Sequence, residues 1–170
     1  MATSVKLTAD MQRVLNEQRL GFVASVCEDG TPNLSPKGTT TVWDDEHIVF
    51  ADICSPGTIA NLRHHPIVEI NVVDPVSRKG YRFKGTATIH QQGPIFEQGL
   101  ALYRQRGTSS PIRSIVLVHV ERAMPLISPA YDQGKTEEEI RASWLQYWHA
   151  LYDHAAANDE QAGGSEIEPI

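Results

Sequence analysis

The sequence predicts a mainly β protein in which about six antiparallel strands, with helices between some of them, close into a barrel. Residues 81–90 carry the clearest signal, because apolar and polar side chains alternate there with the period of two that is typical of a half-buried strand. Asp29-Gly30 is a strong hairpin signal between two further predicted strands, 21–28 and 33–43. A sheet of many short strands usually avoids unpaired edge strands by closing on itself, which favours the barrel.

Three more predicted strands complete the sheet, at 47–52, 67–74 and 112–121. The first of them follows an acidic turn, so we expect it to form an antiparallel meander with the two strands before it. Pro36 interrupts the strand at 33–43. Because proline cannot donate to a strand ladder, Pro36 marks an edge, a bulge or a ligand site.

Four helices are predicted around these strands. Thr8 is the expected N-cap of a helix of about 10 residues. Ser55, followed by proline at the first helical position, opens a second helix. A third covers Phe96 to Tyr103, where apolar residues recur at helical spacing. Thr136 begins a capping box that starts a fourth helix.

The predicted C-terminal helix carries Trp144, Tyr147 and Trp148 close together. Such a group must pack against an apolar surface, which can belong to the chain's own barrel or to a partner subunit. Aromatic enrichment favours an interface. We expect one domain over residues 1–157 and a disordered tail over 158–170, because the tail is polar, acidic and rich in glycine.

Composition excludes several classes of protein. The 170 residues are 41% hydrophobic and 21% charged, which is typical of globular proteins. No stretch approaches the ~18 consecutive apolar residues of a membrane helix, and the N-terminus lacks a secretory signal, so we expect a cytoplasmic protein without membrane contact. The net charge of −6 argues against nucleic-acid binding. Cys27 and Cys54 are too few for a disulfide scaffold, and we expect Cys54 to be buried.

Common catalytic and metal motifs are absent from the sequence. It contains no P-loop, no G-x-G-x-x-G, no G-x-S-x-G and no C-x-x-C. The pairs His64-His65 and His149–His154 lack the spacing with which a helix holds zinc. The sequence therefore predicts no metal site and identifies no catalytic residue.

Two short segments are candidates for binding a phosphorylated ligand. The turn Ser55-Pro-Gly-Thr58 opens a helix, where unpaired amides and a partial positive charge attract phosphate; the alternative is a simple helix cap. The segment Ser35–Thr39 places Lys37 between Pro36 and Gly38, so that a planar group can approach open backbone beside a cation. The alternative there is a solvent-facing lysine on an edge strand.

A third segment, Lys79–Lys84, is basic. It can bind phosphate or nucleic acid, or it can simply be the solvent-exposed face of a strand.

The run NLSPKGTTTVWDDEHIVFADICSPGTIANLRHHPIVEINVVDP, followed by KGYRFKGTATI, resembles the pyridoxamine 5′-phosphate oxidase-related family of FMN-binding split barrels. The similarity covers roughly residues 8–122. It implies a six-stranded antiparallel split β-barrel that forms a homodimer, with FMN in the clefts between subunits. It also implies a flavin-dependent oxidoreductase of a small molecule. The alternatives are a non-catalytic flavin-binding or stress-related module and a deazaflavin-dependent reductase.

The resemblance also implies which residues hold the cofactor. In the family, the strand matching 36–41 lies along the flavin, the end of the next strand lies beside it, the helix start receives the phosphate, and the stretch near Lys79 approaches the ring. The matching residues here are Pro36, Lys37, Gly38, Thr39, Thr41, Ala51, Asp52, Ser55, Gly57, Thr58 and Lys79. The oxidase has a basic pair where this chain has Gly57 and Thr58, and its C-terminal Arg-x-His has no counterpart. Both departures argue against oxidation of vitamin B6.

Overall fold

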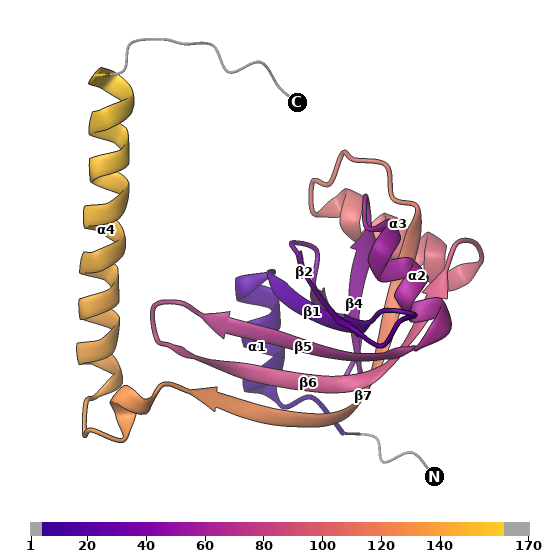
Figure 1. Cartoon of the computed structure of the whole chain (residues 1–170), viewed down its shortest axis with the longest axis horizontal. Coiled ribbons are helices and arrows are strands. Elements are labelled where there is room, and N and C mark those ends of the chain that lie inside the picture. The colour runs from indigo at the N-terminus through magenta and orange to yellow at the C-terminus, as the bar shows by residue number, and fades with distance from the viewer. Residues whose placement is uncertain (1–4, 162–170) are drawn as a thin grey trace. The chain divides into compact units, whose positions relative to one another are not determined.

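The computed structural model of the protein describes residues 5–161, which divide into two compact units (Figure 1). The first unit contains the chain up to Asp74 and Lys79–Leu126. The second contains Pro75–Arg78 and the chain from Ile127 onward. The first unit corresponds to the predicted barrel, and the second carries the C-terminal helix.

The first unit is built on a seven-stranded sheet. Its strands are β1 (Gly21–Val26), β2 (Pro32–Lys37), β3 (Thr41–Val42), β4 (His47–Asp52), β5 (Ile67–Asp74), β6 (Lys79–His90) and β7 (Ser114–Ile127). The order across the sheet is β2-β1-β5-β6-β7-β4-β3. Pairing is antiparallel between β1 and both its neighbours, between β5 and β6, and between β4 and both its neighbours.

The strand expected at 33–43 is in fact two strands, β2 and β3, which form the two opposite edges of the sheet. Only residues 38–40 join them, a connection that reaches about 15 Å at most between Cα atoms. A flat seven-stranded sheet would separate its edge strands by roughly 29 Å. The sheet therefore curls, which confirms the split-barrel fold and raises the expected six strands to seven.

The expected meander of three consecutive strands is wrong, because β4 pairs with β3 and β7 and not with β2. The physical reason is the break at residues 38–40, because the part before it pairs with β1 and the part after it pairs with β4. Pro36 lies before this break. It lies on β2 opposite Phe22 of β1, at the edge where its missing N–H costs no ladder bond. Of the alternatives left open for Pro36, the structure shows the edge position.

Three helices belong to the first unit: α1 (Ala9–Gln18), α2 (Pro56–His64) and α3 (Pro94–Gln105). The predicted cap of α1 is confirmed, because the Thr8 hydroxyl accepts from the amide of Met11 at 3.3 Å. The helix ends at Arg19, whose φ of 54° lies in the left-handed region that glycine favours. The predicted positions of α2 and α3 are confirmed as well.

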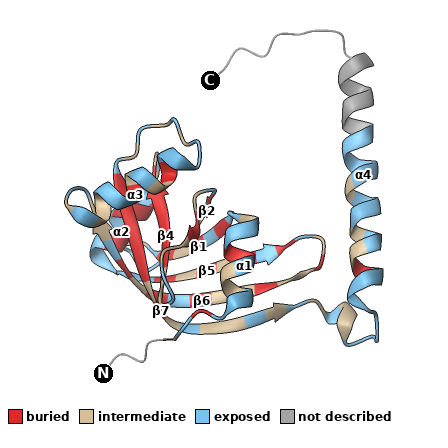
Figure 2. Cartoon of the chain, turned by 180° about the vertical axis from the view of Figure 1, so that it is seen from behind, coloured by how far each residue is buried: buried red, intermediate tan, exposed pale blue. Residues whose placement is uncertain are grey.

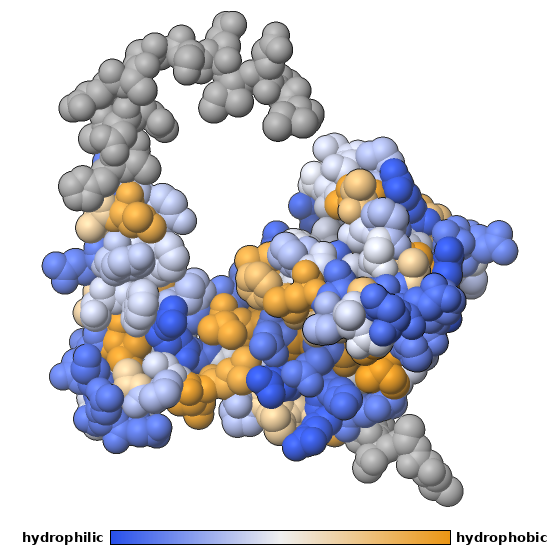
Figure 3. Space-filling model, viewed as in Figure 1, coloured by the Kyte–Doolittle hydropathy of each residue, from blue (hydrophilic) through white to orange (hydrophobic). Residues whose placement is uncertain are grey.

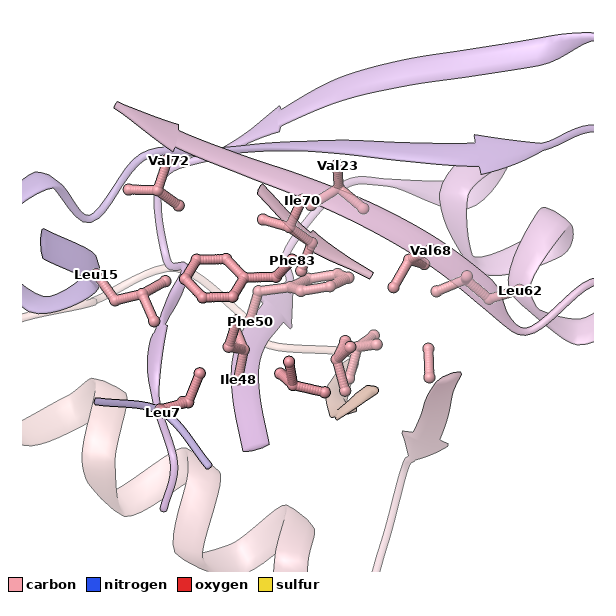
Figure 4. Close-up of a cluster of buried hydrophobic side chains, with 14 of the residues drawn as sticks. Leu7, Leu15, Val23, Ile48, Phe50, Leu62, Val68, Ile70, Val72 and Phe83 are labelled. Atoms are coloured by element: carbon pink, nitrogen blue, oxygen red, sulfur yellow. The ribbon is translucent and has the colours of Figure 1, made fainter. Parts of the chain in front are cut away.

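Two apolar clusters lie on the two faces of β4 and β7, because alternate residues of these strands belong to different clusters. Figure 2 shows that β4 is buried along most of its length. Inside the curl, Phe50 and Phe83 lie within a cluster that α1 and α2 help to close (Figure 4). A second cluster packs Tyr103 of α3 against Val49 and Leu117 on β4 and β7. There is no room for a side chain at Gly85, where a Cβ would collide with the carbonyl of His119 on the neighbouring strand β7.

The second unit joins the tip of the β5–β6 hairpin to the C-terminal segment. Ser128 donates its amide to the carbonyl of Arg78 at 3.1 Å, and the Tyr131 hydroxyl donates to the carbonyl of Ser77 at 2.7 Å. The Arg78 guanidinium lies 4.1 Å from the ring centroid of Trp144, a cation–π contact. These contacts hold the start of the C-terminal helix to the hairpin tip.

The C-terminal helix α4 runs over Glu137–Gln161 and is preceded by a short 3-10 turn at Pro129–Tyr131. Its predicted capping box is confirmed: Thr136 donates its amide to Glu139 Oε2 at 2.8 Å, and the amide of Glu139 donates back to the Thr136 hydroxyl at 3.2 Å. The helix continues past the expected boundary at 157, and residues 162–170 of the expected tail lie outside the described residues. Within residues 5–161, no helix is long and apolar enough to cross a membrane.

Candidate functional site

Lys37 is a buried cation at the end of the edge strand β2, where only 5% of the residue is exposed. Its ammonium donates to the hydroxyls of Ser35 at 2.6 Å and Ser55 at 2.9 Å. Burial lowers the pKa of Lys37 below its usual value, and the charge of Asp52 partly offsets that effect. The interpretation of Lys37 as a solvent-facing surface lysine is therefore wrong.

The start of α2 leaves amides available for a ligand. Ser55 occupies the N-cap position, but its hydroxyl makes no capping bond and instead accepts from Lys37. Pro56 has no N–H, and within the described chain the first-turn amides of Gly57 and Thr58 have no acceptor outside the helix. Gly57 is exposed, and no atom lies within 4 Å of the position of a Cβ there.

Asp52 fixes the turn between β4 and α2. One of its carboxylate oxygens accepts from the Ser55 amide at 2.9 Å, and the other accepts from the Ser114 hydroxyl at 3.3 Å. Asp52 is buried and positions the helix start from behind. We therefore assign it the role of orienting Ser55 and attracting the Lys37 charge.

The connection Gly38–Thr40 is anchored to β4 and α3. The Thr39 hydroxyl accepts from the Ala51 amide at 2.9 Å, which ties the connection to the end of β4. The Tyr103 hydroxyl donates to the carbonyl of Thr39 at 2.9 Å, and burial raises the pKa of Tyr103 far above its usual value, so this donor stays protonated. Gly38 is exposed with open space where a side chain would be.

A cavity of about 200 Å³ borders the same connection. It is lined by Arg19, Gly38, Thr39, Thr40, Tyr103, Arg106, Gly107 and Thr108. The Arg106 guanidinium donates to the Thr41 hydroxyl at 2.6 Å, and that hydroxyl donates in turn to Asn16 at 2.7 Å. Within the described chain, neither Arg19 nor Arg106 pairs with a carboxylate. Two uncompensated guanidiniums at one cavity are suited to a small anion.

The structure thus brings together ten of the predicted site residues around β2, the 38–41 connection, the end of β4 and the start of α2. Lys79 is placed elsewhere. It lies opposite Asp74 in the β5–β6 hairpin, and its charge helps to lower the pKa of Asp10 on α1. In the sheet, β1 and β5 separate its strand from β2.

Sequence reasoning missed Arg19, Tyr103 and Arg106 as site residues. They come from the ends of α1 and α3, and only the curled sheet brings these ends to the connection. The one local signal was Tyr103 on the apolar face of a predicted helix, which indicates core as readily as a site. Cys54 was expected to be buried and is exposed, because it lies in the turn just before α2. Within residues 5–161, no group of three His, Cys, Asp or Glu side chains is placed to hold a metal.

The comparisons with known proteins agree with this fold. The family model of pyridoxamine 5′-phosphate oxidase matches residues 7–126, which is most of the chain. The protein therefore belongs to the pyridoxamine 5′-phosphate oxidase family. Among curated proteins, the uncharacterized protein MJ0282 of Methanocaldococcus jannaschii is 31% identical over 91 residues, which cover 52% of this chain and 60% of that protein. The chain thus spans less than two thirds of that relative.

Among solved structures, the HupZ protein of Group A Streptococcus is 33% identical with a TM-score of 0.65, over 71% of this chain and 94% of that chain. Two more distant structures share the fold alone. One is an FMN-binding protein of Syntrophomonas wolfei, at 16% identity and TM-score 0.61 over 70% and 85% of the two chains. The other is an F420 reductase, at 21% identity and TM-score 0.56 over 69% and 98%.

Proposed function

We propose that the protein binds FMN and acts as a flavin-dependent oxidoreductase on a small anionic substrate. The observation that carries this proposal is the pairing of Lys37 with Ser55. It takes the N-cap hydroxyl away from the helix and leaves a buried cation beside free first-turn amides. A phosphate is the chemical group that such a site stabilises best. Membership in the family and the FMN-binding relative support the choice of a flavin phosphate.

The residues of the site fit FMN. The phosphate would lie at the start of α2, where the amides of Gly57 and Thr58 and the Ser55 hydroxyl can donate to it and Lys37 can neutralise it. The ring would lie against the backbone at Gly38, where there is no side chain and the space is open. When bound, the flavin supplies the hydride chemistry, and the protein supplies orientation and charge.

The cavity lined by Arg19 and Arg106 supports an anionic substrate. It shares Gly38 with the surface on which the ring would lie, so a substrate held there would be next to the flavin. The bond from Arg106 to Thr41 fixes one guanidinium in place before any ligand arrives. Preorganised charge of this kind costs little rearrangement on binding.

We further propose that the functional unit is a homodimer formed through the outer face of β1, β2 and β5. Over these strands Figure 3 shows hydrophobic side chains between hydrophilic ones. The apolar patch consists of Phe22, Val26, Leu34, Pro36 and Ile67, and 66% of Leu34 is exposed. Patches of this kind on a soluble protein mark interaction surfaces. Its position next to Lys37 would bring a second subunit to the edge of the cofactor site.

The test begins with the absorption spectrum of the purified protein and the mass of any flavin that it carries. The apoprotein is then titrated with FMN, riboflavin and a deazaflavin. We expect FMN to bind at least tenfold more tightly than riboflavin, because only FMN has the phosphate. Equal affinities would contradict the phosphate site, and exclusive binding of the deazaflavin would favour a reductase of the F420 kind. Anaerobic reduction by a nicotinamide, followed by reoxidation, separates an enzyme from a flavin-binding module without turnover.

A further inference from the structure

Apart from Pro75–Arg78, the second unit lies beyond the part of the chain that the family model matches. The family model ends at residue 126, and HupZ aligns over 94% of its own length while covering 71% of this chain. The helix α4 and the turn that anchors it therefore add a structure that the family barrel does not need. An addition of this size requires a physical explanation of its own.

The helix α4 carries an aromatic stripe, formed by the half-buried Trp144 and Trp148 and the exposed Tyr147, Leu151 and Tyr152. These positions follow the spacing i, i+3, i+4, i+7, i+8 that places side chains on one face of a helix. The rings contact each other along the helix, with Trp148 stacked on Tyr152 at 6.0 Å between centroids. Even so, 52% of Tyr147 and 66% of Tyr152 remain exposed. The contacts within the second unit therefore leave much of the stripe uncovered.

The charges on α4 restrict what can cover it. Between Glu137 and Asp153 the helix has four carboxylates and a single arginine, Arg141. A partner surface should therefore be apolar in part and basic beside it. The cation–π contact of Arg78 with Trp144 already shows that the stripe accepts guanidinium groups.

The outer face of the sheet has this combination. Next to the apolar patch, a hollow of about 130 Å³ is lined by Glu69, Arg82, Lys84, Arg122 and Met124. We call it the basic hollow. Nε of Arg82 lies 3.1 Å from a carboxylate oxygen of Glu69, whereas the side chains of Lys84 and Arg122 make no ion pair or hydrogen bond within the described chain. The hollow is continuous with the apolar patch, because Glu69 is opposite both Ala24 of β1 and Lys84 of β6.

We propose that α4 docks its aromatic stripe onto the basic hollow of a second copy of this chain, so that two copies exchange helices. The inference rests on the homodimer proposed above and adds its second contact surface. The apolar patches would meet each other, and each acidic, aromatic helix would cover the two unpaired cations of the other copy. Such an exchange is isologous and closed, which gives a dimer and not a filament.

A photo-crosslinking experiment tests the exchange in the full-length protein. The variant Tyr152→p-benzoylphenylalanine is irradiated as a mixture of isotopically light and heavy copies, and crosslinked peptides are identified by mass. We expect mixed light–heavy crosslinks from residue 152 to segments 82–84 or 122–124. Crosslinks within one copy, crosslinks between two α4 helices, or none at all would overturn the proposal.

Substitutions provide a second measurement and separate the helix exchange from the homodimer proposed above. The double variant Tyr147→Ser/Tyr152→Ser and the double variant Lys84→Glu/Arg122→Glu should each weaken dimerisation by about tenfold or more in sedimentation, because aromatic anchors and their partners carry most of the binding energy. Lys6→Glu, an exposed lysine on another part of the chain, is the control. If the dimer persists with unchanged affinity, the helix exchange fails while the proposed dimer stands. If the wild type is a monomer at every concentration, both fail.

Discussion

The ammonium of Lys37 donates to the hydroxyl of Ser55 across 2.9 Å, although the two residues are 18 positions apart in the chain. A serine at this position of a helix ordinarily accepts from the helix's own amides. Here the Ser55 hydroxyl accepts from the buried lysine instead, and the amides of Gly57 and Thr58 remain free to bind another acceptor. Removing the lysine therefore affects the stability of α2 and the affinity for an anion in different ways.

We predict that Lys37→Met weakens FMN binding by about 10- to 100-fold, because hydrogen bonds to a charged group contribute roughly 1.5–3 kcal/mol. The free energy of unfolding should change little or rise, since a buried charge is replaced by an apolar chain and Ser55 becomes free to cap α2. Fluorescence titration with FMN and urea unfolding measure the two quantities. Lys6→Met serves as the control, and a loss of stability without a loss of affinity would contradict this role for Lys37.

The same lysine should give opposite pH dependences to stability and binding. Burial lowers the pKa of Lys37 below its ordinary 10.5. Between the pKa of Lys37 in the folded protein and that in the unfolded chain, the unfolded chain binds more protons than the folded protein. The stability due to this group therefore rises with pH across that window, and it is lost as the pH falls through the pKa in the folded protein. The free energy of unfolding of the wild type, relative to Lys37→Met, should increase from neutral pH toward 10.5. FMN affinity should fall over the same window.

A constant stability difference between the two proteins across that range would show that Lys37 titrates in the folded protein as it does in water.

The exposed first turn of α2 allows a sharper test of the phosphate site. Thr58→Asp would place a carboxylate there, but Thr58 is buried, whereas Gly57 is exposed with open space at its Cβ position. We predict that Gly57→Asp stabilises the helix by about 0.5 kcal/mol through the helix dipole and yet weakens FMN binding by at least tenfold through like-charge repulsion.

Gly57→Asn, similar in size but neutral, should retain most of the affinity. Equal affinities of the Asp and Asn variants would rule out an anion at this helix start.

Arg19 combines backbone strain with a position on the cavity. Its φ of 54° costs roughly 1–2 kcal/mol for a residue other than glycine. We predict that Arg19→Gly raises the free energy of unfolding by about 1 kcal/mol and weakens the binding of inorganic phosphate, used as a probe, to the FMN-loaded protein. Arg106→Gln should weaken phosphate binding without the gain in stability, since Arg106 has no such strain. If Arg19→Gly binds phosphate as the wild type does, Arg19 is only a helix end.

Disrupting the apolar patch should release the flavin if the dimer forms the site. Leu34 is exposed in the single chain, so Leu34→Asp should change the stability of the monomer by no more than about 0.5 kcal/mol. We expect it to give a monomer in sedimentation and to lose FMN on gel filtration. Gln92→Asp, an exposed change on the β6–α3 turn, is the control. A Leu34→Asp monomer that keeps one FMN per chain would place the site within one subunit.

The local signals in the sequence predicted the local structure well. The caps at Thr8 and Thr136 and the alternation at 81–90 depend only on neighbouring residues, and all three are confirmed. The edge position of Pro36 is also a local consequence, because it follows from a missing donor. The resemblance of the whole run 33–89 predicted the family and the split barrel.

The parts that sequence reasoning missed depend on contacts between distant segments. Nothing near Gly38 indicates that the strands on its two sides join opposite edges of one sheet. The hydroxyl of Ser55 is typical of a cap, and only the fold brings Lys37 to it. Arg19 and Arg106 are separated by most of the barrel in sequence, so the cavity that they line has no signature in either segment.

The short connection between β2 and β3 has a consequence for how this family can vary. Most surface loops accept extra residues at small energetic cost. This connection limits the distance between the two edge strands β2 and β3, and each inserted residue would let that distance grow by up to about 3.5 Å. Length changes at this point would therefore move the backbone that borders the cavity, without altering any of the side chains that line it.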